Sequence, residues 1–219
     1  MGAKKISTKK IPVVFEAPIA SGMLRHFVSA VSGGNLYRQQ SFLEGVIGES
    51  VFPDFFSIEE DPFVLRGLSS SAFDNEGVQT EKRSIVSSGR LEGLFLSTYS
   101  ARKLGLASTG NAGGAHNLSV HARGHTHEFG DLLKMMDTGF LVTDLLGHGT
   151  NMVTGDYSRG ASGFWVENGE IIHPVQEVTV AGNLKDMFKA IRGVGNDHLN
   201  RSSFKVGSLL IDSMTVGGD

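Results

Sequence analysis

Cysteine is absent from this 219-residue chain, and that absence narrows the chemistry open to it. Disulfides, thiolate zinc ligands and cysteine nucleophiles are all excluded, and the composition fits a reducing compartment. No apolar run approaches the ~18 residues that a membrane-spanning helix needs. The apolar stretch near the N-terminus is interrupted by Pro12, Glu16 and Pro18, which is unlike a signal peptide. We therefore expect a cytoplasmic protein with no membrane partner.

Excess positive charge is also lacking. The formal net charge is −3, which argues against direct nucleic-acid binding. The hydrophobic fraction of 40% and the charged fraction of 20% are ordinary for a soluble globular protein. The length allows one large domain or two small ones.

Strand-like and helix-like segments alternate irregularly along the chain. This order favours an α+β fold with a largely antiparallel sheet and a few helices over repeating βαβ units. We expect strands at 10–17, 84–100, 139–147, 151–158, 161–182 and 204–218, and helices at 23–31, 100–106, 128–139 and 183–195. A Gly-Gly break follows the first helix before more helix resumes, Asn168-Gly169 predicts a hairpin turn, and the glycine-rich stretch 107–127 is typical of a long loop.

His26 stands where a metalloprotease helix would carry its first zinc ligand. The H-E-x-x-H motif needs a Glu next to that His and a second His one turn later. Phe27 follows His26 instead, and no second His lies within the next turn. One imidazole cannot hold a catalytic zinc ion, so the residues alone favour an ordinary structural histidine.

Other candidate groups are scattered. His121, His125, His127 and Glu128 would suit a metal, but their loop context favours a flexible polar segment. The acidic run, which comprises Asp54, Glu59, Glu60 and Asp61, is expected to stay solvated. Ser162 lacks the spacing of a nucleophile elbow. Tyr99 and Trp165 lie in patterns typical of core packing. We therefore assign no catalytic, cofactor-binding or metal-binding residue.

Several long stretches resemble the PmbA/TldD family, and specifically its PmbA (TldE) branch. They run from 21 to 43, 51 to 62, 72 to 117, 154 to 188 and 194 to 197, and include "AFDNEGVQTEKRSIVSSGRLEGLFLSTYSARKLGLASTGNAGGAHN". The resemblance covers the whole chain and implies the α+β C-terminal domain of these proteins. Family members also have an N-terminal domain of similar size, which is missing here.

The resemblance also implies a role. In the TldD branch the matching helix carries HExxxH, and a later Cys completes the zinc site. On this chain the first His falls on His26, the Glu on Phe27, the second His on Val31 and the Cys near Val206. His26 is then a remnant in a subunit that does not bind the catalytic metal. The implied partners are a TldD-like catalytic subunit and a peptide substrate, in a homo- or hetero-oligomer.

Two other functions remain open from the sequence. One is an active metallopeptidase with zinc held in the His121–His127 loop. The other is a stand-alone module that binds peptides along exposed strand edges, since such binding needs only main-chain hydrogen bonds.

Overall fold

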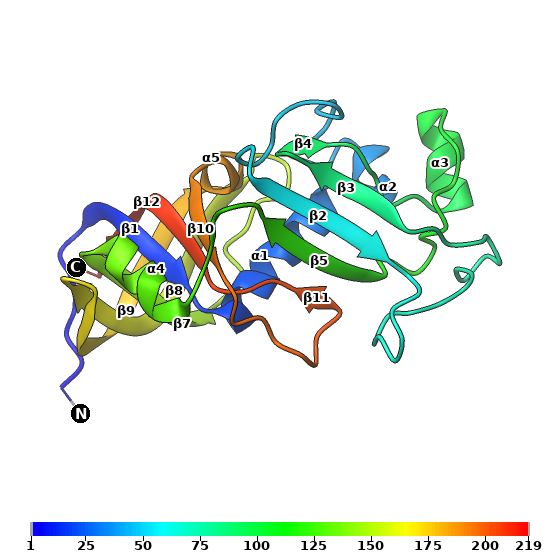
Figure 1. Ribbon diagram of the computed structural model, residues 1–219. Coiled ribbons are helices and arrows are strands. Elements are labelled where there is room, and N and C mark those ends of the chain that lie inside the picture. The colour runs from blue at the N-terminus through cyan, green and yellow to red at the C-terminus, as the bar shows by residue number, and fades with distance from the viewer. Residues whose placement is uncertain (1, 219) are drawn as a thin grey trace. The chain divides into compact units, whose positions relative to one another are not determined.

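A computed structural model describes residues 2–218, and the chain forms two compact units. Unit 1 comprises residues up to 22, 124–199 and from 206 on, and unit 2 comprises 23–123 and 200–205. Each unit contains a β-sheet, and strands outnumber helices in the described chain, so the predicted α+β class is confirmed (Figure 1). Within residues 2–218, no helix has both the length and the apolar character needed to cross a bilayer.

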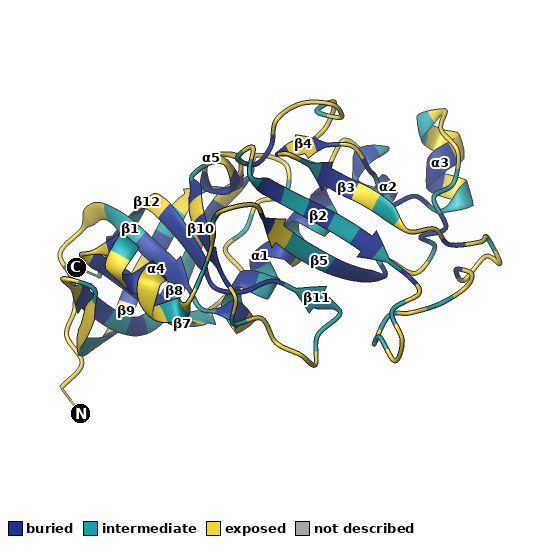
Figure 2. Cartoon of the chain, viewed as in Figure 1, coloured by how far each residue is buried: buried dark blue, intermediate teal, exposed yellow. Residues whose placement is uncertain are grey.

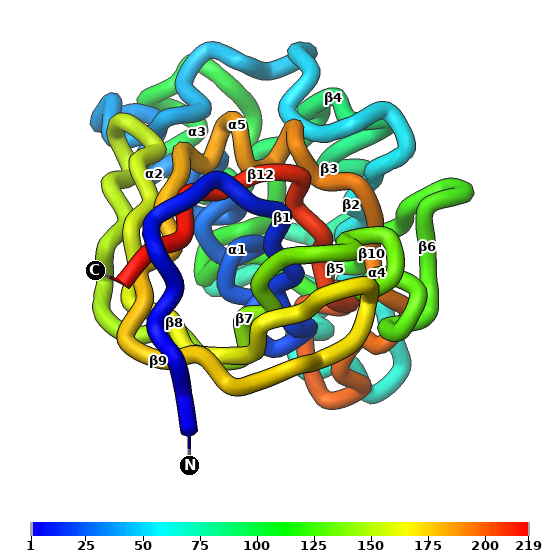
Figure 3. The backbone as a smooth tube through the Cα atoms, turned by 90° about the vertical axis from the view of Figure 1, so that its left-hand side faces the viewer, coloured from blue at the N-terminus to red at the C-terminus, as the bar shows by residue number. Residues whose placement is uncertain are grey.

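Unit 1 is built on a sheet that closes on itself. Its strands follow the order β1-β7-β8-β9-β12-β10-β6, and β1 also pairs with β12. The N-terminal and C-terminal strands therefore lie side by side (Figure 3). Closure leaves fewer free strand edges, the usual sites of unwanted pairing. The strands are β1 Lys9–Phe15, β6 Thr126–His127, β7 Gly139–Leu146, β8 Asp156–Glu167, β9 Glu170–Asn183, β10 Ile191–Gly195 and β12 Leu209–Gly217.

Local signals explain two features of unit 1. Asn168 and Gly169 have φ values of 52° and 75°, so the predicted β8–β9 hairpin turn is confirmed. Asn183 caps helix α5 (Leu184–Lys189) by accepting a hydrogen bond from the Lys185 N–H. The helix expected over 183–195 was too long, because Ile191–Gly195 instead forms β10 and pairs with β12. Helix α4 (Phe129–Met136) contributes to an apolar cluster that includes buried residues of four strands of the sheet, β1, β7, β8 and β12.

Unit 2 contains a second sheet of order β11-β5-β2-β3-β4. Along β2 the side chains alternate between buried and half-buried, as expected of a strand with one face on the core (Figure 2). Ser88 and Gly89 have positive φ and form the predicted turn between β3 and β4. The strands are β2 Phe56–Asp61, β3 Arg83–Ser87, β4 Arg90–Leu91, β5 Asn117–Ala122 and β11 Phe204–Lys205.

The helices that belong wholly or partly to unit 2 are α1 Ala17–Ala30, α2 Gly33–Leu36 and α3 Thr98–Leu104. The Gly-Gly pair is not a simple break, because Gly33 begins α2. A Cβ at Gly33 would overlap the Ser100 side chain of α3, so glycine allows these two helices to approach closely.

Two further expectations were wrong. The stretch 107–127 is not one long loop, since its second half forms β5, between β11 and β2 in the unit 2 sheet, and then β6 in unit 1. Of the strand expected over 151–158, residues 151–155 form turns, and β8 starts only at Asp156.

Candidate functional site

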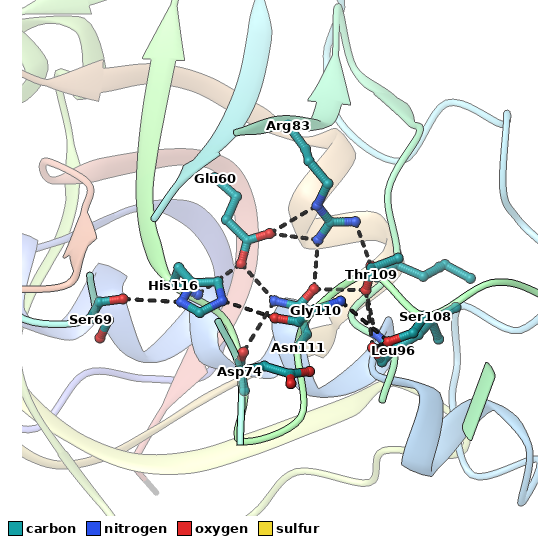
Figure 4. A network of polar contacts seen from close by, with 12 residues as sticks. Glu60, Ser69, Asp74, Arg83, Leu96, Ser108, Thr109, Gly110, Asn111 and His116 are labelled. Atoms are coloured by element: carbon teal, nitrogen blue, oxygen red, sulfur yellow. Dashed lines mark hydrogen bonds and ion pairs between the residues drawn. The ribbon is translucent and has the colours of Figure 1, made fainter. Parts of the chain in front are cut away.

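A buried polar network lies in unit 2 around the carboxylate of Glu60. Glu60 is 1% exposed, yet it sits in β2 within the acidic run that was expected to remain in solvent. Its Oε2 accepts hydrogen bonds from Nε and Nη2 of Arg83 in β3, the first at 3.1 Å. Its Oε1 accepts from the Asn111 side chain and from the His116 N–H, both at 2.8 Å (Figure 4). Both oxygens are therefore fully engaged, which is what makes a buried charge tolerable.

Asn111 links this ion pair to the glycine-rich segment that follows it. Its amide oxygen accepts from Arg83 Nη2 at 2.9 Å and from the Thr109 hydroxyl at 2.7 Å. Its amide nitrogen donates to Glu60 and to the carbonyl oxygen of Gly114 at 3.1 Å. Four hydrogen bonds fix this one side chain, so the backbone that carries it is held in place as well.

The imidazole of His116 is buried between two carbonyl oxygens. Nδ1 lies 3.1 Å from the oxygen of Ser69, and Nε2 lies 3.0 Å from the oxygen of Gly110. Both ring nitrogens are thus within hydrogen-bonding distance of a main-chain acceptor, and the tautomer decides which of them donates. His116 therefore connects the loop after β2 with the glycine-rich segment.

Asp74 fixes the same segment from another side. Its carboxylate accepts from the N–H groups of Glu76, Val78 and Ala112, each at 2.9 Å. Burial raises the pKa of Asp74, but these three N–H groups and the positive field of His116 outweigh it, so that the pKa lies below its usual 3.8.

A pocket of about 330 Å³ opens beside this segment, within unit 2. We call it the Tyr37–Tyr99 pocket. One wall comes from the end of α1 and the start of α2, a second carries aromatic rings, and the third is the glycine-rich segment. Its lining residues are Val28, Ser32, Gly34, Tyr37, Phe95, Ser97, Tyr99, Ser100 and Asn111 to Ala115.

Of the four positions that the resemblance placed at the zinc site, only His26 carries a side chain able to bind zinc. His26 is half-buried near the end of α1. Phe27 and Val31 are fully buried, and the Phe27 ring meets Phe52 edge-on with centroids 5.2 Å apart. Val206 is also buried, but it belongs to unit 1 whereas the other three belong to unit 2.

The histidine-rich stretch does not assemble a metal centre. His121 lies exposed in β5 of unit 2, while His125 and His127 belong to unit 1, with ring centroids 6.4 Å apart. Over residues 2–218, no three His, Asp or Glu side chains gather in a way that would hold a metal ion. Zinc bound by this stretch therefore has no support in the geometry.

The remaining candidates are distributed as follows. Trp165 is buried as expected, but Tyr99 is 51% exposed and lines the pocket, so its assignment to the core was wrong. Ser162 lies within β8 rather than on a sharp turn after a strand. Sequence reasoning missed Asn111 and His116, because their contacts with Arg83 and Glu60 span 28 to 56 residues and no local spacing connects them.

Fold and site together define a sheet-rich α+β domain whose described residues bury an ion-pair network instead of a metal centre. Comparison with known proteins gives this domain its family. The chain belongs to the family described as PmbA/TldA metallopeptidase, C-terminal domain, which matches residues 8–218. The resemblance seen in the sequence is thereby confirmed.

Its relatives agree on this assignment. Metalloprotease PmbA of Escherichia coli O157:H7 is 50% identical over 218 residues, which is 100% of this chain and 48% of that protein. The Haemophilus influenzae PmbA homologue is 50% identical over 219 residues, again 100% of this chain and 48% of the relative. The chain thus spans about half the length of the curated relatives it matches.

Solved structures share the fold. A Bacteroides thetaiotaomicron protein named as a modulator of DNA gyrase superimposes with a TM-score of 0.94 at 32% identity, covering 100% of this chain and 49% of that one. TldE from Thermococcus kodakarensis gives a TM-score of 0.85 at 22% identity, covering 99% and 52%. At that identity the second likeness concerns the fold alone.

Proposed function

We propose that this chain is a non-catalytic domain of a zinc metalloprotease complex of the TldD/TldE type, which acts on peptides. In this arrangement a TldD-like partner subunit supplies the zinc and the general base. This chain contributes partner surface and part of the wall along which the peptide lies. The assembly works in the cytoplasm as a hetero-oligomer.

One observation carries the proposal. The two positions that would supply a Glu and a second His are Phe27 and Val31, and both are fully buried among apolar neighbours. Phe27 packs on Phe52, which in turn stacks on Phe56 with ring centroids 4.6 Å apart. A water-activating carboxylate needs access to water and metal, and this position offers neither.

Zinc analysis tests this proposal. Purified without chelator and then dialysed, the chain should hold well below one zinc ion per molecule and should not cleave peptides alone. Mixed with a TldD-type subunit that keeps HExxxH, it should co-elute with that subunit in gel filtration. The matched control is the TldD-type subunit itself, which should retain zinc under the same dialysis. Stoichiometric zinc in this chain, with peptide hydrolysis, would overturn the proposal.

A further inference from the structure

The Tyr37–Tyr99 pocket has the features of a peptide subsite. We propose that it receives an aromatic side chain of an extended peptide, and that an acidic residue next to that side chain contacts the cations beside the two tyrosines. This inference rests on the proposed function for the idea that peptides reach the chain. The residues that line the subsite all belong to unit 2.

The aromatic wall of the pocket can contact an aromatic ring of the peptide. Tyr37 and Tyr99 meet edge to face with centroids 5.7 Å apart, and Phe95 lines the pocket beside them. Tyr99 is 51% exposed, which is unusual for a large ring that makes a defined aromatic contact. A third ring entering the pocket would gain offset or edge-to-face contacts worth about 0.5 to 1.5 kcal/mol beyond its buried area.

The glycine-rich wall provides main-chain hydrogen bonds. Within the described residues, the N–H groups of Gly113 and Ala115 have no hydrogen-bond partner. Both residues line the pocket, so these N–H groups belong to the wall that a bound peptide would meet. Gly113 and Gly114 have φ values of 111° and 117°. The Asn75 side chain fills the space beside Gly113, whereas nothing lies within 4 Å of where a Cβ of Gly114 would be. A peptide backbone can therefore approach Gly114 closely.

This wall is held rigid before any ligand arrives. Asn111 is fixed by its four side-chain hydrogen bonds. Ala112 donates its N–H to Asp74 and accepts from the Asn75 N–H at 3.0 Å. Ordering a loop on binding normally costs free energy, and a pre-formed wall avoids much of that cost.

Charge at the rim favours an acidic neighbour in the peptide. The Arg38 guanidinium lies 5.2 Å from the Tyr37 ring centre, and the Lys103 ammonium lies 5.7 Å from that of Tyr99. Both cations are exposed. The carboxylates of Asp74 and Glu76 bind main-chain N–H groups at Ala112 and Thr98. Each of these carboxylates is engaged by the main chain, and the exposed cations are what an acidic side chain of the peptide would meet.

The experiment is an amide NMR titration of the purified chain with short blocked peptides. The main probe is acetyl-Gly-Phe-Glu-Gly-amide, compared with versions that carry Ala in place of Phe or Lys in place of Glu. We expect the Gly113 and Ala115 amide signals to move downfield with the main probe. The Ala version should bind about fivefold or more weakly, from the loss of the aromatic contacts. The Lys version should bind about threefold more weakly, as befits an exposed charge pair.

Variants sharpen the test. Tyr99→Ala should weaken the main probe about fivefold, and Tyr99→Phe should restore binding because the ring, not the hydroxyl, makes the contact. Leu65→Ala is the matched control, since Leu65 is 90% exposed in the same unit but does not line the pocket. No shift of the two amides at millimolar peptide, or equal weakening by Leu65→Ala, would overturn the subsite.

Competition by adenosine monophosphate at the same amides would also overturn it, by assigning the pocket to a nucleotide. The zinc content of the chain, measured on the same sample, reports on the proposed function separately. The subsite can thus fail while the chain remains free of zinc.

Discussion

Replacing Arg83 by methionine tests whether the buried network holds unit 2 together. The Glu60 side chain is 1% exposed and the Arg83 side chain 17% exposed, so little water can replace the lost guanidinium. In Arg83→Met the Glu60 Oε2 loses both of its donors, while Oε1 keeps Asn111 and His116. Breaking a buried pair in this way typically costs about 3 to 5 kcal/mol of unfolding free energy.

The magnitude should depend on which partner is removed. Glu60→Gln removes the negative charge but keeps the shape and an acceptor for Asn111 and His116, so a cost of about 1.5 to 3 kcal/mol is expected. The double variant Arg83→Met with Glu60→Gln should lose less unfolding free energy than the two single variants together. The reason is that it no longer contains a buried carboxylate that lacks its cationic partner.

Urea unfolding combined with hydrogen exchange of the segments 57–62 and 109–117 measures these effects. The control is Lys82→Met, at the residue directly before Arg83. Lys82 forms ion pairs with Glu59 and Asp61, and its side chain is exposed. That variant should match the parent within error. If Arg83→Met cost no more than Lys82→Met, the reasoning about the network would be refuted.

Three further predictions follow from particular residues. Phe27→Glu should cost about 4 kcal/mol in urea unfolding, because it removes a buried ring and buries a carboxylate at a fully enclosed position; a variant as stable as the parent would show that this position reaches water. The pKa of Asp74 is lowered in the folded chain, so the stability that its carboxylate contributes is present above pH 3.8 and is lost as the pH falls through the lower folded pKa. Asp74→Asn should therefore destabilise the chain by about 2 kcal/mol at pH 7 and flatten its acid unfolding curve below pH 3.8. Burial raises the pKa of Tyr157 to about 12, against a smaller opposing effect of Arg159, so the stability it contributes is present below pH 10 and is lost as pH rises through 12. Tyr157→Phe should therefore lack that alkaline loss, and an unchanged alkaline unfolding curve would contradict the assignment.

The sequence predicted those parts of the fold that depend on local signals. Asn168-Gly169, Ser88-Gly89 and the Asn183 cap each require a particular backbone geometry, and each was recognised from a few residues. Elements that depend on distant partners were not recognised. Residues 117–122 read as loop because histidine and glycine surround them, yet β2 and β11 pair with them and make them a strand.

The candidate site was harder to predict for the same reason. The acidic run was expected to remain solvated, since adjacent carboxylates usually do. Glu60 departs from that rule only because Arg83, Asn111 and His116 come to it from three later segments. Likewise, Tyr99 lies in an apolar pattern, and only the three-dimensional arrangement shows that it faces a pocket.

The way the chain threads through both units has a consequence for its synthesis. Unit 2 needs β11 from residues 200–205, and the closed sheet of unit 1 needs β12, whose Val216 lies opposite Lys9 of the first strand. A ribosome that has translated the chain as far as residue 199 has therefore completed neither sheet. Such long-range pairing makes folding slow and leaves strand edges open to other nascent chains. Residues 204–205 and 209–217 must therefore be synthesised before either sheet can be completed.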